Sequence, residues 1–131
     1  MSTATQSLMI LIAGPYRSGT GDDPALMEAN LRALESVALP LYRAGHVPLI
    51  GEWLALPLLR EAGSKRPGDA IYDEIVYPIA NRLIMRCDGV LRLPGSSKGA
   101  DEDVRLAREL GLPVWKTLSD VPGCADIAKA R

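Results

Sequence analysis

The sequence contains few of the residues that build metal sites and disulfide frameworks. Its 131 residues include only two cysteines, Cys87 and Cys124, and a single histidine, His46. The cysteines form no Cys-x-x-Cys pair and no cluster with histidine, so we expect no zinc site, and a reduced chain is a simpler interpretation than a disulfide. We expect His46 to be structural, because it follows Gly45 at a predicted helix-to-strand junction. The sequence therefore implies no metal and no cofactor.

Excess charge of one sign and long apolar segments are also absent. Fifteen basic and sixteen acidic residues give a formal net charge of −1, which does not favour nucleic acid or an anionic membrane as a partner. The longest apolar run near the N-terminus, at residues 8–13, is far too short to span a bilayer, and no basic segment typical of a secretory signal precedes it. We therefore expect a cytoplasmic protein with a small-molecule ligand, no nucleic acid polymer as partner and no membrane.

The hydrophobic pattern predicts one domain over residues 1–131, with peripheral tails at 1–7 and 119–131. The length and the hydrophobic fraction of 47% are ordinary for a single globular domain. Short apolar runs predict strands at residues 8–13, 46–50, 89–93 and 114–118. Longer segments predict helices at residues 24–43, 51–60, 70–86 and 100–110, with kinks at Pro40 and Pro78. Strands that alternate with helices indicate an α/β fold with a parallel sheet covered on both faces.

Local signals mark where the helices begin and which faces they bury. Asp22 or Asp23 can cap the first predicted helix, and Asp69 can cap the third. In that third helix Ile71, Ile75, Ile79 and Leu83 recur at intervals of four residues and form one apolar face.

Two glycine-rich loops follow predicted strands. The first, GPYRSGTG at residues 14–21, follows the first strand, and the second, PGSSKG at residues 94–99, follows the third. Ligands of open parallel sheets collect at the carboxyl ends of the strands, where the strand order reverses. Both loops are therefore expected to line one crevice.

The first loop has the chemistry of an anion site but no nucleotide fingerprint. It lacks the spacing of the dinucleotide motif and the Gly-Lys-Ser/Thr ending of a P-loop. It does offer close backbone approach at its glycines, an arginine, Arg17, and the hydroxyls of Tyr16, Ser18 and Thr20. A plain turn with an exposed arginine is the alternative.

The second loop opens a predicted helix whose first turn carries Asp101, Glu102 and Asp103. The unpaired N–H groups and partial positive charge of a helix N-terminus suit a phosphate or a carboxylate. Each acid taken alone could simply offset the helix dipole, whereas the loop and acids together favour a site. A carboxylate there is expected to be ionised, and it could act as a nucleophile or stabilise an oxocarbenium-like sugar.

Several of these motifs together resemble the nucleoside 2-deoxyribosyltransferase superfamily, in particular its small bacterial domains. The matching runs are CDGVLRLPG at 87–95, SKGA at 97–100, Ala107, GLPV at 111–114, IAGPY at 12–16 and GHVP at 45–48, so the resemblance covers residues 8–118. It implies a flavodoxin- or Rossmann-like sheet of about four to five strands and a homodimer or higher homo-oligomer. It also implies cleavage of the N-glycosidic bond of a nucleoside or nucleotide, with the sugar passed to another base or to water.

The resemblance also assigns roles to individual residues. Phosphate binding falls on Gly14, Pro15, Arg17, Ser97 and Gly99. The nucleophile position, four residues before Ala107, falls on Asp103, where the family has glutamate, and Glu102 is the alternative nucleophile. Because aspartate is one methylene shorter, a domain that binds nucleotides without cleaving them is a second hypothesis. A third hypothesis is a phosphoribohydrolase acting on a nucleoside 5′-monophosphate. Residues 94–103 distantly resemble the glycine-rich motif of that family.

Four further residues are weaker candidates. The resemblance suggests that Tyr16 contacts the sugar or the nucleophile, although a partly buried loop tyrosine is equally consistent with the pattern. Asp88, just before the third strand, is a candidate for substrate binding, with a turn or helix-end cap as the alternative. Glu52 and Trp53 follow the second strand, where the family gathers base-contacting groups, and core packing is the alternative for the tryptophan.

Overall fold

The core of the protein is a four-stranded parallel sheet with the strand order β2-β1-β3-β4. The structure is a computed structural model and describes residues 6–125. The strands are β1 (Met9–Ala13), β2 (Val47–Leu49), β3 (Gly89–Arg92) and β4 (Val114–Trp115). This confirms the predicted parallel α/β fold, and the order matches the first four strands of a flavodoxin-like sheet. The fourth strand is shorter than predicted because the chain turns into a 3-10 helix at Leu118–Asp120.

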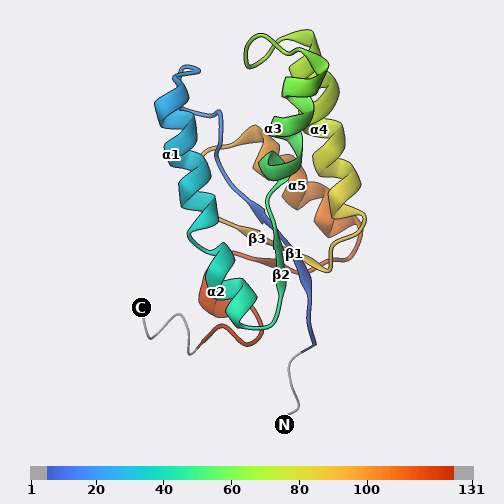
Figure 1. The fold of residues 1–131 in the computed structure, drawn as a ribbon. Coiled ribbons are helices and arrows are strands. Elements are labelled where there is room, and N and C mark those ends of the chain that lie inside the picture. The colour runs from blue at the N-terminus through green and yellow to red at the C-terminus, as the bar shows by residue number, and fades with distance from the viewer. Residues whose placement is uncertain (1–5, 126–131) are drawn as a thin grey trace.

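Five α-helices in the described residues cover both faces of this sheet (Figure 1). They are α1 (Pro24–Glu35), α2 (Ala38–Arg43), α3 (Gly51–Ala62), α4 (Ala70–Ile84) and α5 (Lys98–Glu109). Helices α1 and α2 cover one face, and α4 and α5 cover the other. No helix among residues 6–125 is long and apolar enough to cross a membrane.

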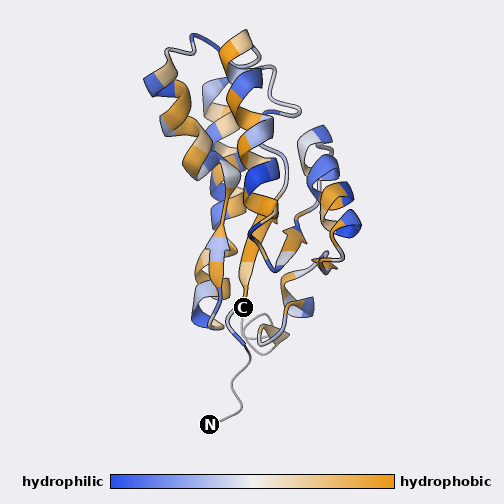
Figure 2. Cartoon of the chain, turned by 90° about the vertical axis from the view of Figure 1, so that its right-hand side faces the viewer, coloured by the Kyte–Doolittle hydropathy of each residue, from blue (hydrophilic) through white to orange (hydrophobic). Residues whose placement is uncertain are grey.

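The side chains of β1 alternate between two hydrophobic cores. Ile10 and Ile12 pack in a cluster with α1 and α2, whereas Leu11 and Ala13 pack in a cluster with α4 and α5. All four side chains are at most 4% exposed. A strand that is buried on both faces needs an apolar side chain at every position, which explains the continuous apolar run. Figure 2 shows the same division, with mainly hydrophobic strands inside helices of mixed character.

Side-chain caps fix where three of the helices begin. The Asp23 carboxylate accepts a hydrogen bond from the Ala25 N–H at the start of α1, and Asp69 accepts one from Tyr72 at the start of α4. Ser97 caps α5, which begins two residues before the predicted start. The acids at 101–103 therefore lie deeper in this helix than the sequence indicated.

The predicted helix at 24–43 is interrupted at Ser36 and Val37, which separate α1 from α2. The physical reason is Pro40, which has no N–H to donate to the Ser36 carbonyl and whose ring clashes with that carbonyl in a continuous helix. The predicted kink is thus a break, placed four residues before the proline. In contrast, α4 continues through Pro78.

The C-terminal segment is part of the core as far as the structure describes it. Val121 and Cys124 are at most 1% exposed, and both pack in the cluster with α1 and α2. His46 is 2% exposed: its Nδ1 accepts a hydrogen bond from the Leu8 N–H, and its Nε2 donates to the Pro122 carbonyl. Residues 119–125, which the sequence assigned to a peripheral tail, therefore contribute two side chains to the core, and residues 126–131 lie outside the described residues. The structural role expected for His46 is confirmed.

Candidate functional site

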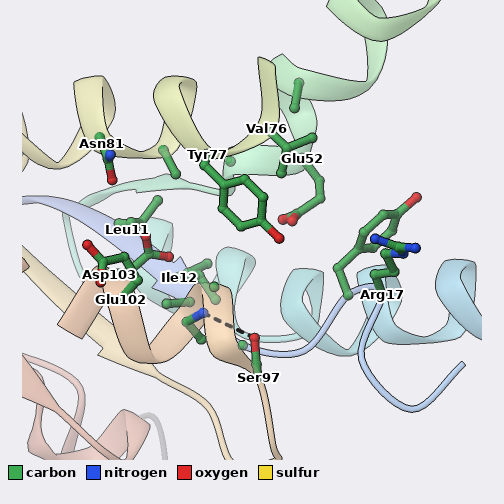
Figure 3. Close-up of a pocket in the computed structure, with 18 of the residues that line it drawn as sticks. Leu11, Ile12, Arg17, Glu52, Val76, Tyr77, Asn81, Ser97, Glu102 and Asp103 are labelled. Carbon is green, nitrogen blue, oxygen red and sulfur yellow. Dashed lines mark hydrogen bonds between the residues drawn. The ribbon is translucent and has the colours of Figure 1, made fainter. Parts of the chain in front are cut away.

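A pocket lies at the carboxyl end of β1, between the glycine-rich loop that follows it and the starts of α3 and α5 (Figure 3). Helix α4 forms the remaining wall. This is the edge at which the order of the strands reverses, between β1 and β3, and it is where the sequence predicted a crevice. Of the candidate residues, the pocket is lined by Gly14, Tyr16, Arg17, Glu52, Ser97, Gly99, Glu102 and Asp103.

Asp103 is a partly buried acid that lines this pocket from α5. Burial is the main cause that raises the pKa of its carboxyl group from 3.8 to about 7, and the nearby charges of Glu52 and Glu102 raise it further. The guanidinium of Arg92 acts in the opposite direction. The sequence had suggested an ionised carboxylate favoured by the helix N-terminus. The carboxyl instead lies beyond the first turn, where loss of solvent outweighs the helix dipole.

Glu52 is the second desolvated acid, and it reaches the pocket from the first turn of α3 (Figure 3). Burial raises the pKa of its carboxyl group, while a hydrogen bond from its own backbone N–H opposes the shift. The pocket therefore brings together two carboxyl groups from different helices, and both hold a proton more readily than exposed acids do.

Glu102 differs from both of these acids, because its carboxylate is paired on the helix surface. Arg105 on the same helix donates to both oxygens, from Nε to Oε1 at 2.9 Å and from the terminal nitrogen to Oε2 at 2.5 Å. These bonds lower the pKa of Glu102. Its side chain is 43% exposed. Glu102 is thus an ionised group at the rim of the pocket, whereas Asp103 is a partly buried acid whose pKa is raised by loss of solvent.

Tyr16 and Tyr72 supply hydroxyl groups next to the acids. Burial, followed by the charge of Glu52, raises the pKa of both tyrosines, that of Tyr72 to about 12. The Asn30 side chain donates a hydrogen bond to the Tyr16 carbonyl at 2.8 Å and so ties this part of the loop to α1. Both phenols therefore remain protonated at neutral pH and can donate hydrogen bonds into the pocket.

Arg17 is held in a fixed position at the mouth of the pocket. Its Nε and a terminal nitrogen donate to the two carboxylate oxygens of Asp22, at 2.7 and 3.1 Å. The guanidinium lies 5.5 Å from the centre of the Tyr72 ring. Gly68 also lies against it, since an added Cβ there would come within 2.5 Å of the guanidinium. The arginine is therefore packed against both a loop backbone and an aromatic ring.

The second glycine-rich loop is held against the first by contacts at Gly95. This glycine has φ 117°, and an added Cβ would lie 2.6 Å from Cγ of Pro15. Arg92 donates hydrogen bonds to the carbonyls of Leu93 and Gly95 and to the Asp101 carboxylate. The structure thus gives Pro15 a packing role between the loops, and it does not line the pocket.

Two glycines and a serine from the predicted phosphate site do line the pocket. Ser97 is buried and accepts the Ala100 N–H as helix cap, so its hydroxyl hydrogen is free to donate elsewhere. An added Cβ at Gly14 would lie 2.8 Å from the Leu34 side chain, so this glycine is required by packing of the loop against α1.

The structure does not bring Trp53 and Asp88 to the pocket. The indole N–H of Trp53 donates to the Glu35 carboxylate at 2.7 Å, and the side chain is 39% exposed beside α1. Asp88 precedes β3, so it lies at the opposite, amino edge of the sheet. There it accepts a hydrogen bond from the Met9 N–H at 2.8 Å. Neither position fits the role expected from sequence.

Sequence reasoning missed the contribution of α4. The pocket is lined from this helix by Tyr72, Val76, Tyr77, Ala80 and Asn81. Positions 72, 76 and 80 recur every four residues, as do 77 and 81, and this spacing was the available signal. The face they form lies one residue away from the predicted stripe at 71, 75, 79 and 83. Figure 3 shows the Tyr77 ring entering the pocket from this helix.

Among the described residues no group of three or more His, Cys, Asp or Glu side chains could hold a metal ion. Cys87 and Cys124 are both free and buried. Comparison of the chain with protein-family models, with curated proteins and with solved structures finds no match.

Proposed function

We propose that this protein cleaves the N-glycosidic bond of a nucleoside or nucleotide and passes the sugar to water or to another base. The observation that supports this most directly is the pair of desolvated carboxyl groups, Asp103 and Glu52, on two walls of one pocket. Glycosidic cleavage needs one ionised carboxylate and one proton donor around an oxocarbenium-like sugar. The resemblance to the nucleoside 2-deoxyribosyltransferase superfamily supports the same chemistry.

In the proposed mechanism Asp103 is the nucleophile. Its ionised carboxylate attacks C1′ and forms an ester with the sugar, while the bond from C1′ to the base nitrogen breaks. The electron pair of that bond goes to the base, which takes a proton from Glu52. Water or a second base then attacks C1′, releases the Asp103 carboxylate and returns a proton to Glu52. The aromatic wall of Tyr16, Tyr72 and Tyr77 is suited to contact a base and a sugar.

Glu102 is the less suitable nucleophile. Its carboxylate accepts hydrogen bonds from Arg105, and attack would require these bonds to be broken. An exposed acid is also better solvated, which makes it a weaker nucleophile than an enclosed one. We therefore assign the attack to Asp103 and leave Glu102 to shape the rim of the pocket.

A nucleotide-binding domain without turnover is the second candidate function. The shorter side chain of Asp103, compared with the glutamate of the family, favours it, because near-attack geometry is sensitive to displacements of about 1 Å. The Asp103→Glu variant discriminates between the two functions. A large gain in base release would indicate that the natural site binds and does not cleave.

The test is base release from ribo- and deoxyribonucleosides and their 5′-monophosphates, followed by chromatography. Wild type is compared with Asp103→Ala, Glu102→Ala and Glu52→Gln. Glu109→Ala serves as the control, because Glu109 lies on α5 outside this pocket. We expect release that is lost in Asp103→Ala, reduced about 10²- to 10⁴-fold in Glu52→Gln, and retained in the other two variants. Release that requires Glu102 and not Asp103 would contradict the assignment.

The same panel separates the remaining alternatives. Cleavage confined to ribonucleoside monophosphates, with ribose 5-phosphate as product, would favour a phosphoribohydrolase. Failure of every compound to be cleaved, with monophosphates still raising the melting temperature, would leave the binding domain. The resemblance also implies a homo-oligomer, and the half-exposed apolar side chains of Leu54 and Leu58 on one face of α3 support this. Light scattering on the full chain measures that property independently.

A further inference from the structure

The cation expected to bind a phosphate is already occupied by a carboxylate of the same loop. Arg17 makes two parallel hydrogen bonds to Asp22, at 2.7 and 3.1 Å, and this is the geometry with which arginine also binds a phosphate. Each partner shifts the pKa of the other so that both stay charged at neutral pH. Asp22 does not line the pocket itself, but its carboxylate takes up two of the donors that Arg17 could offer to a phosphate.

The loop is built to hold Asp22 in this place. Asp22 has φ 63°, the left-handed region that non-glycine residues seldom adopt, and its N–H donates to the Thr20 hydroxyl at 3.1 Å. That hydroxyl in turn donates to the Arg17 carbonyl at 2.5 Å. Thr20 is only 6% exposed although it lies in a surface loop. One buried threonine thus joins the backbone of Arg17 to that of Asp22.

The charges around the pocket also disfavour a phosphate. Its lining, within the described residues, contains three acids, Glu52, Glu102 and Asp103, and one basic side chain, Arg17. With Arg17 neutralised by Asp22, a dianionic phosphate would gain little and would be repelled by whichever of these acids is ionised. The basic residues Arg60, Lys65 and Arg66 line a separate groove on the other side of Tyr16 and Tyr72.

We propose that Asp22 is a specificity-determining residue: by occupying Arg17, it makes the pocket select neutral nucleosides over their 5′-monophosphates. This inference rests on the proposed function, since it names the substrate class of the same pocket. The Arg17–Asp22 pair is about 40% exposed, at 39% and 41%, and exposed pairs are weak. The preference for nucleosides over monophosphates therefore comes from two effects of Asp22 together, its negative charge and its occupation of the Arg17 donors. Removing the Asp22 carboxylate reverses this preference.

The experiment measures binding of the four deoxynucleosides and their 5′-monophosphates by calorimetry, on the full chain carrying Asp103→Asn so that the ligand is not consumed. Asp22→Asn and Asp22→Gly are introduced into this chain. Both replacements suit a positive φ, so the loop backbone is kept. Glu28→Gln is the matched control, because it removes one negative charge from α1, where Glu28 pairs with Arg32 and not with Arg17.

We expect the parent chain to bind a nucleoside at least as tightly as its monophosphate. In both Asp22 variants the Kd of the monophosphate should fall at least about threefold, and that of the nucleoside should change less than about twofold, which is the scale of one exposed ion pair. Adding Arg17→Gln to Asp22→Asn should abolish the gain, and Glu28→Gln should leave both constants unchanged. The ratio of kcat/KM for the two ligands, measured without Asp103→Asn, should shift in the same direction.

Two results would overturn this inference and leave the proposed function intact. One is release of base from nucleosides with no change of preference in either Asp22 variant. The other is a parent chain that binds monophosphates tenfold more tightly than nucleosides through Arg17. Binding of neither ligand, together with no base release, would overturn the proposed function as well.

Discussion

The carboxyl groups of Glu52 on α3 and Asp103 on α5 face one pocket from different helices, and the charge of Glu52 raises the pKa of Asp103. Burial makes the larger contribution to this shift. Neither acid is paired with a basic side chain in the described structure. The backbone hydrogen bond to Glu52 and the charge of Arg92 near Asp103 therefore offset only part of the cost of burial. This arrangement has consequences that can be measured without knowing the substrate.

The first consequence is a pH-dependent stability. The pKa of Asp103 is about 7 in the folded chain and close to 3.8 in the unfolded chain. The folded state therefore retains this proton to higher pH, and the contribution of the group to stability is full below about pH 4 and is lost as the pH rises through 7. We expect Asp103→Asn, which cannot ionise, to be more stable than wild type at pH 8 by about 2–4 kcal/mol.

Urea unfolding at pH 5, 6, 7 and 8 measures this difference. The advantage of the variant should grow from pH 5 to pH 7 and level off towards pH 8. Asp73→Asn is the control, because it removes an exposed carboxyl from α4 away from the pocket lining. Its stability should run parallel to that of wild type. Parallel curves for Asp103→Asn as well would mean that the Asp103 carboxyl is solvated.

The second consequence concerns the coupling between the two acids. Replacing Glu52 by glutamine removes a negative charge that disfavours ionisation of Asp103, so the pKa of Asp103 should fall below 7. It should stay above 3.8 because burial remains the main cause. The carboxyl carbon of Asp103, followed by NMR during a pH titration, reports this value directly. Glu61→Gln, an exposed acid at the other end of α3, should leave the titration unchanged.

Base release should have a bell-shaped dependence on pH. The proposed mechanism needs an ionised Asp103 together with a protonated Glu52, and this state is populated only while the pair holds one proton. The rate should rise as the pair loses its first proton and should fall as it loses its second, near pH 7. In Glu52→Gln the fall at high pH should disappear while the remaining slow rate still rises. Profiles of kcat/KM for both chains measure this, and a flat profile would count against the mechanism.

The sequence predicted most of the fold because the strands are buried on both faces. Leu11 and Ile12 point to opposite cores, and such a strand can only be a short continuous apolar run. The helix caps could also be predicted from the sequence, because a cap such as Asp69 accepts its hydrogen bond from a backbone N–H only three residues away, at Tyr72. The break at Ser36 was not predicted in its position, because the effect of Pro40 acts one turn earlier in the chain.

The site was only half predictable. Gly14, Ser97 and Asp103 belong to loops and helix starts at the carboxyl edge of the sheet, and topology brings these together. Tyr77 and Asn81 lie in the middle of a helix, where hydrophobic periodicity identifies the side packed on other elements and not the side that lines a hydrated pocket. The pairing of Arg17 with Asp22 depends on the positive φ of Asp22. The sequence does not predict this φ, because the residue at that position is not a glycine.

The position of the two loops should depend on Gly95. Its φ of 117° lies in a region that favours glycine, and an added Cβ would come within 2.6 Å of Cγ of Pro15. We expect Gly95→Ala to destabilise the protein by about 1–3 kcal/mol, because backbone strain and overpacking act together. It should also weaken ligand binding, since Gly14 and Ser97 would be displaced from each other.

Gly111→Ala is the matched control for this last variant. Gly111 also has a positive φ, of 76°, but nothing lies within 4 Å of an added Cβ there. It should therefore show the cost of backbone strain alone and leave binding unchanged. Adding Pro15→Ala to Gly95→Ala removes the clashing Cγ, so it should restore part of the stability in thermal unfolding. If the double variant were less stable than Gly95→Ala alone, contact with Pro15 would not be the cause, and the loops would be held by Arg92 and its hydrogen bonds to Leu93 and Gly95.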